Sequence, residues 1–75
     1  MINTILKRAN EIASLKRSLG MDAAPWTMES CLKAACNECL ASYEHLPADC
    51  YEVRSMAGEV CPVSVHTGQW VTGWI

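Results

Sequence analysis

The sequence predicts a small α+β domain in which two amphipathic helices, with a short third one, are packed by a C-terminal β-hairpin. Apolar residues recur at helical spacing over residues 3–19 and again over residues 27–46. A capping-box pattern favours a short helix over residues 50–57. Alternating apolar and polar residues on both sides of a two-residue turn predict a hairpin of residues 60–66 and 69–75.

The first helix is indicated by one apolar stripe and by a clear C-terminal end. The stripe consists of Ile2, Ile5, Leu6, Ala9, Ile12 and Ala13. Asn3 or Thr4 can cap the start of this helix. Lys16 and Arg17 suit its last turn, and Gly20 can adopt the left-handed conformation that ends many helices.

The second helix is expected to start after Thr27, which is a favourable N-cap residue, and to end before Pro47. A short connection that contains Pro25 separates it from the first helix. Its apolar face consists of Met28, Cys31, Leu32, Ala35, Cys39, Tyr43 and Leu46.

Residues 50–57 fit two patterns. Asp49 and Glu52 have the spacing of a capping box, and a glycine that can end a helix follows the segment. Tyr51 and Val53 alternate with charged residues, as in a strand. We expect a short helix here, with a strand as the alternative.

The C-terminal hairpin is predicted with a defined register. A two-residue turn at Thr67 and Gly68 pairs residues whose side chains share one face: Val65 with Trp70, Val63 with Thr72, and Cys61 with Trp74. Five of these six side chains can be buried, whereas the opposite face carries mostly polar residues. Pro62 has no N–H group and is expected at a bulge or a sheet edge.

Size, composition and charge limit the classes of function. The 75 residues allow one domain, residues 1–75, and exclude a conventional two-domain enzyme. With 51% apolar and 19% charged residues the chain is not a disordered tail, and its net charge of −2 argues against a surface that binds nucleic acid throughout. No apolar run could span a bilayer, and the N-terminus has no signal-peptide pattern. We therefore expect a cytoplasmic protein with reduced thiols.

The five cysteines raise the question of a metal site. Cys36, Cys39, Cys50 and Cys61 could supply four thiolates to a zinc ion. The Cys-x-x-Cys pair, however, falls within a predicted helix, and the two later cysteines are single. We expect small core residues and no cofactor, and we keep a zinc-stabilised regulator as the alternative.

Catalysis and nucleic-acid binding receive little support from the sequence. No motif marks a nucleophile, an oxyanion hole or a substrate cleft, so we expect no enzyme. Residues 1–19 have a net charge of +3 and residues 20–75 a net charge of −5. In the zinc-regulator alternative, the first helix contacts nucleic acid through Lys7, Arg8, Lys16 and Arg17, although these residues do not form one stripe.

A surplus of large apolar side chains indicates a protein partner. A domain of this size buries only about 60% of the surface that its chain could expose, yet this chain has three Trp, four Met and six Leu. Aromatic residues and methionine are enriched at interfaces. The expected contact residues are Trp26, Trp70, Trp74, Tyr51, Leu15 and Leu40. The chain is thus expected to be a non-enzymatic interaction protein or a homodimer. It is similar in kind to the inhibitors and adaptors of phages and other mobile elements, which act by binding a larger host protein.

Overall fold

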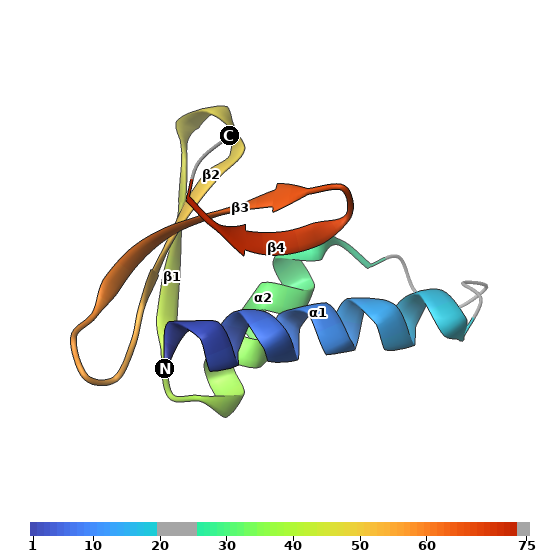
Figure 1. The fold of residues 1–75 in the computed structure, drawn as a ribbon, viewed down its shortest axis with the longest axis horizontal. Coiled ribbons are helices and arrows are strands. Elements are labelled where there is room, and N and C mark those ends of the chain that lie inside the picture. The colour runs from blue at the N-terminus through green and yellow to red at the C-terminus, as the bar shows by residue number, and fades with distance from the viewer. Residues whose placement is uncertain (20–25, 74–75) are drawn as a thin grey trace.

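The computed structural model describes residues 1–19 and 26–73, which form two helices and a four-stranded antiparallel sheet (Figure 1). The elements are α1 (Ile2–Ser18), α2 (Met28–Glu38), β1 (Ser42–Leu46), β2 (Cys50–Arg54), β3 (Val60–His66) and β4 (Gln69–Thr72), with a 3₁₀ turn, Pro47–Asp49, between β1 and β2. The strands lie in the order β1–β2–β3–β4, so β1 and β4 are the two edges of the sheet. The α+β class is therefore confirmed.

Helix α1 agrees with the predicted helix to within one residue at each end. All six residues of the predicted stripe are buried. The N-cap is Met1, and no side chain makes a cap hydrogen bond there, so the capping role predicted for Asn3 or Thr4 is wrong. The predicted end signal at Gly20 lies outside the described residues.

Helix α2 is shorter than predicted. It begins with a capping box in which Thr27 and Ser30 bond each other's backbone N–H groups at 3.1 Å. It ends at Glu38, because Leu40 takes a left-handed conformation (φ 55°) and the chain turns back. Residues 42–46 form strand β1, so the predicted helix over residues 27–46 is wrong in its second half.

Strand β2 replaces the short helix that was expected over residues 50–57. Tyr51 and Val53 are buried, and Tyr51 pairs with His45 in β1 and with Val63 in β3. A segment with a neighbouring strand on each side satisfies its backbone groups without a helix. The strand-like alternation, kept above as the alternative, is therefore the correct interpretation of this segment.

The predicted register of the C-terminal hairpin is confirmed over the described residues. Val65 faces Trp70 and Val63 faces Thr72, with positive φ angles at both residues of the Thr67-Gly68 turn. The predicted pairing of Cys61 with Trp74 lies outside the described residues.

The burial expected for this hairpin is only partly correct. Val63 and Trp70 are buried and Cys61 is half-buried, but Val65 is exposed, because the core reaches only the centre of this face of the sheet. Ser64, on the opposite face, is buried, and its hydroxyl donates to the Gly73 carbonyl at 2.6 Å.

Pro62 lies within the central strand β3, where it pairs with Glu52 of β2 in a regular register, so the bulge considered for it is absent from the described strands. Its carbonyl accepts a hydrogen bond of 2.8 Å from the Gly73 N–H, and the pairing of β3 with β4 stops beside it.

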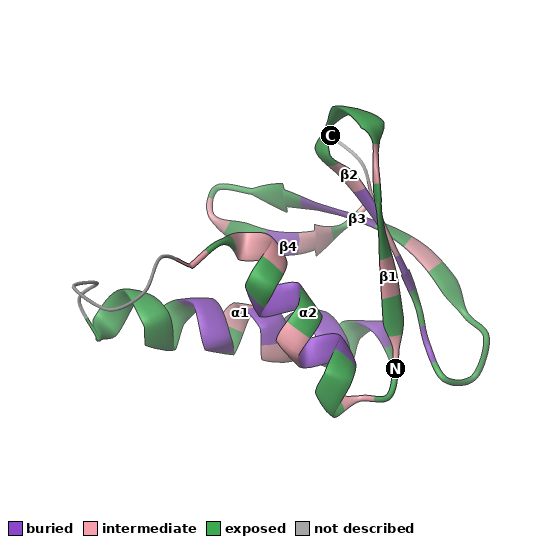
Figure 2. Ribbon diagram, turned by 180° about the vertical axis from the view of Figure 1, so that it is seen from behind, coloured by how far each residue is buried: buried purple, intermediate pink, exposed green. Residues whose placement is uncertain are grey.

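The core lies between the two helices and the inner face of the sheet (Figure 2). Ile5 of α1, Leu32 of α2, Val53 of β2 and Val63 of β3 are fully buried there. The sheet that meets the helices has four strands, so the hairpin predicted to pack them is only half of it. The outermost strand on the other side, β1, has no buried residue.

Candidate protein-binding edge of the sheet

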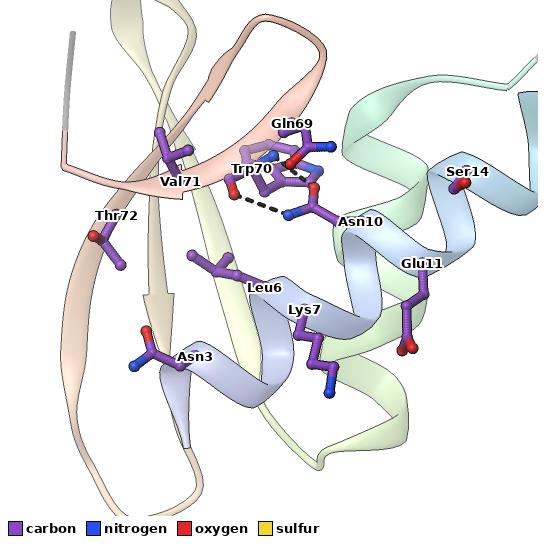
Figure 3. Close-up of a pocket in the computed structure, with 10 residues that line it drawn as sticks. All are labelled: Asn3, Leu6, Lys7, Asn10, Glu11, Ser14, Gln69, Trp70, Val71 and Thr72. Atoms are coloured by element: carbon purple, nitrogen blue, oxygen red, sulfur yellow. Dashed lines mark hydrogen bonds between the residues drawn. The ribbon is translucent and has the colours of Figure 1, made fainter.

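The edge formed by β4 is closed at Trp70 by a side chain, whereas Thr72, the other outward residue of this strand, has no such bond within the described residues. The Asn10 amide nitrogen donates to the Trp70 carbonyl at 3.0 Å, and the Trp70 N–H donates to the Asn10 amide oxygen at 2.7 Å (Figure 3). The amide thus takes the place of a neighbouring strand at this residue. The Trp70 indole is also fixed, because its N–H donates to the Met28 carbonyl at 3.0 Å.

In the groove beside this edge, the Asn10 amide is not free to bind a ligand. The groove has a volume of about 640 Å³ and lies between α1 and β4 (Figure 3). Asn10 projects from α1 toward β4, and both ends of its amide are already bonded to Trp70. Lys7 and Glu11 also line the groove and have opposite charges.

Strand β1 leaves its outward backbone groups unbonded. In an antiparallel sheet the N–H and C=O of one residue point to the same side, and the sides alternate along the strand. The hydrogen bond from Gly73 to Pro62 fixes this alternation for β3, and the register of the strands carries it to β1. In β1, this alternation directs the N–H and C=O of Tyr43 and His45 away from β2. Within residues 1–19 and 26–73, nothing bonds to these four groups.

A hollow lies on each side of the first residues of β1. One has a volume of about 260 Å³ and is lined by Ser42, Tyr43, Glu44, Glu52 and Arg54. The other has a volume of about 210 Å³ and is lined by Lys33, Cys36, Asn37, Ala41, Ser42 and Tyr43. A segment that pairs with an edge strand sends alternate side chains to the two faces of the sheet. The first hollow borders β1 on the side of β2, and the second borders it on the side of α2. We call the outward side of Ser42–Leu46, together with these hollows, the β1 edge.

The outer side of the β1 edge carries two acidic side chains that face each other. Glu44 in β1 lies directly opposite Glu52 in β2. Like charges in this position destabilise a sheet. Within the described residues, neither carboxylate has a basic group within 4.0 Å, although Arg54 lines the same hollow.

On the inner side, a polar network holds the side chains of β1 against the protein. Glu29, in the first turn of α2, accepts a hydrogen bond of 2.8 Å from the Tyr43 hydroxyl and one of 3.4 Å from the Tyr51 hydroxyl. The His45 ring stacks on Tyr51 at 4.4 Å and lies 3.5 Å from Glu29 and 3.2 Å from Asp49. Partial burial and the bond to Glu29 raise the pKa of Tyr43 to about 12, so its hydroxyl remains a donor at neutral pH. Because the side chains of Tyr43 and His45 contact the protein, the free edge of β1 presents mainly the backbone groups of these two residues.

The four cysteines considered as zinc ligands do not come together. Cys36 is buried in α2, and Cys39 lies at the C-terminal end of that helix. Alternation along the strands puts Cys50 and Cys61 on opposite faces of the sheet, since Cys61 pairs with Val53. Among the residues described, no group of three or more His, Cys, Asp or Glu is placed to hold a metal ion. The alternative zinc site of Cys36, Cys39, Cys50 and Cys61 is therefore wrong.

The basic residues of α1 do not form a single surface. The Arg8 guanidinium lies 2.9 Å from the Glu38 carboxylate. Arg17 donates to the Gly68 carbonyl at 2.7 Å and lies over the Trp26 ring at 5.6 Å. Two of the four bases proposed to contact nucleic acid are thus engaged with the protein itself. The other two are Lys7, in the groove beside β4, and Lys16, which is exposed.

The residues predicted to contact a partner differ in exposure. Tyr51 and Trp70 are core residues, with 8% and 2% of their surface exposed. Trp26 is half-buried, whereas Leu15 and Leu40 are 56% and 72% exposed. Trp74 lies outside the described residues.

Sequence reasoning missed the β1 edge because it assigned residues 42–46 to a helix. The signal that could have found the strand is the short alternation in which Tyr43 and His45 flank the acidic Glu44. That alternation spans only a few residues, so it predicts a strand less strongly than the apolar stripe continuing from α2 predicts a helix.

The geometry defines a small α+β protein in which a side chain closes one sheet edge at Trp70, while the other edge, β1, has no neighbour among the described residues. No known protein family, no curated protein and no solved structure matches the chain. None of the described helices is long and apolar enough to cross a lipid bilayer.

Proposed function

We propose that this protein is a non-enzymatic inhibitor or adaptor, which binds a larger protein by pairing its β1 edge with an extended segment of that protein. The observation that carries the proposal is the contrast between the two edges. Asn10 closes β4 at Trp70, whereas no described residue bonds the outward groups of Tyr43 and His45. Addition of a strand to an exposed sheet edge is a common mode of peptide recognition.

Leu40 supports this location of the binding surface. It lies two residues before β1 and is 72% exposed. Its left-handed backbone (φ 55°) is unfavourable for leucine by about 1 kcal/mol. The exposed Leu40 side chain makes little packing contact within the protein that could offset this cost. Contact with a partner at this end of the β1 edge would explain why a leucine is present here.

The chemistry of the titratable groups favours binding over catalysis. Burial raises the pKa of Cys31, and it raises the pKa of Cys36 to about 11, which leaves both thiols protonated and unreactive at neutral pH. The two ring nitrogens of His45 lie beside the carboxylates of Glu29 and Asp49. In this proposal the protein acts in the cytoplasm, where its five free cysteines stay reduced.

Proline substitution tests the proposal, because proline is tolerated on an edge strand where its missing N–H faces outward. His45→Pro removes one outward donor from β1. Thr72→Pro is the matched control, since Thr72 lies two residues after Trp70 and has its N–H on the outward side of β4.

The measurement is affinity capture from lysate followed by mass spectrometry, with circular dichroism to confirm that each variant is folded. Wild type and Thr72→Pro should retain the same protein partner, and His45→Pro should lose it. Equal capture of that partner by folded His45→Pro would contradict the proposal.

A further inference from the structure

We infer that the β1 edge selects an extended segment whose residue opposite Glu44 is a lysine or an arginine. This inference rests on the proposed function, because it names the chemistry of the segment that pairs with β1. It comes from the two carboxylates beside the unbonded backbone groups of the strand.

Backbone pairing determines which partner residue meets Glu44. The outward groups of Tyr43 and His45 bond the incoming strand on both sides of Glu44. The partner residue between these bonds forms a non-hydrogen-bonded pair with Glu44, in which the Cα atoms are about 4.5 Å apart and the side chains are closest. In this pairing its side chain lies on the outer face, next to Glu44 and to the hollow of about 260 Å³ that Glu44, Glu52 and Arg54 line.

The charge in that hollow favours a cation. Glu44 and Glu52 face each other across β1 and β2, and the one basic side chain that lines the same hollow, Arg54, lies more than 4.0 Å from either carboxylate. Two acidic groups and one basic group leave this lining with an excess of negative charge. A lysine or arginine side chain there relieves the repulsion between the two carboxylates and gains attraction from both. An acidic side chain at the same position adds a third negative charge, which costs binding energy.

The same charges disfavour a second copy of this chain as the partner. A symmetric antiparallel pair that uses all four outward groups must bond Tyr43 to the His45 of a second copy, so the symmetry axis passes beside Glu44. Each Glu44 then faces the Glu44 of the other copy, next to its own Glu52. Four carboxylates would then meet beside only two Arg54 side chains, one from each copy, and we therefore infer a different, basic segment as the partner.

Three synthetic peptides test the inference. Each is a capped heptapeptide of alternating threonine and valine, and the central residue is lysine, norleucine or glutamate. Each is titrated into ¹⁵N-labelled full-length protein and followed by NMR. The amide signals of Tyr43 and His45 report pairing with β1, and the dissociation constants report the preference for charge.

The lysine peptide should shift both amide signals and bind about tenfold more tightly than the glutamate peptide at low salt. Added salt should reduce this ratio, because the carboxylates are at the surface. The double variant Glu44→Gln/Glu52→Gln should remove the preference. The control Glu11→Gln, which changes a carboxylate on α1, should leave it intact.

The outcomes separate the inference from the proposed function. If all three peptides shift the two amides with equal affinity, the charge preference is refuted and the proposed pairing stands. If none shifts them, both are refuted. If the two signals change with protein concentration alone, a second copy occupies the edge and the basic segment is refuted.

Discussion

Leu40 adopts a backbone conformation that glycine supplies more readily. Its φ of 55° lies at the end of α2, where the Ala41 N–H donates to the Cys36 carbonyl at 2.8 Å, as in many helix ends closed by glycine. Replacing leucine by glycine relieves this strain, and the exposed leucine side chain contributes little packing.

Leu40→Gly should therefore raise the free energy of unfolding by about 1 kcal/mol, as measured by urea denaturation. Leu15→Gly, at an exposed position inside α1, should lower it by about 1 kcal/mol. Destabilisation by Leu40→Gly would mean that the leucine packs in the folded protein. If Leu40 contacts the partner, the stabilised variant should also bind that partner more weakly.

Among the elements, β4 depends on α1 for the protection of its edge. Asn10→Ala leaves the outward N–H and C=O of Trp70 without partners at a part-buried position. This loss should lower the free energy of unfolding by about 1–3 kcal/mol in urea denaturation. Ser14→Ala, in the same groove but at an exposed position, should change it by less than about 0.5 kcal/mol. Equal effects of the two substitutions would show that the amide does not act as a substitute strand.

Elements whose structure follows from a local sequence pattern could be predicted. Elements whose structure depends on pairing with residues distant in the sequence could not. α1 has an uninterrupted apolar stripe, and the hairpin has a turn that fixes its own register. The end of α2 has leucine where a glycine would have marked the stop. Tyr43 suits both a helical stripe and an alternating strand, and its pairing with Val53 decides between them. The candidate site depends on β1 being a strand, so it could not be predicted without the sheet.

At the scale of the whole molecule, stability should decline in alkaline solution. Burial raises the pKa of Cys36 from 9.0 to about 11, and burial together with the bond to Glu29 raises the pKa of Tyr43 from 10.0 to about 12. As the pH rises through this range, the unfolded chain releases these protons before the folded chain does. The free energy of unfolding should therefore fall from about pH 9 upward, with no contribution from either group at neutral pH.

Urea denaturation from pH 7 to pH 11 measures this decline. Cys36→Ala should reduce the part that begins near pH 9, to which buried Cys31 also contributes, and keep the part above pH 10 that belongs to Tyr43 and Tyr51. A free energy of unfolding that stays constant to pH 11 in the wild type would refute these assignments.

The difference between the two edges is the central feature of the molecule, and backbone hydrogen exchange of the free protein tests it most directly. The Trp70 amide, bonded to Asn10, should be protected, whereas the outward amides of Tyr43 and His45 should exchange rapidly. Protection of Tyr43 and His45 as strong as that of Trp70 would mean that β1 is already covered, and would contradict both its role as an open edge and the function proposed from it.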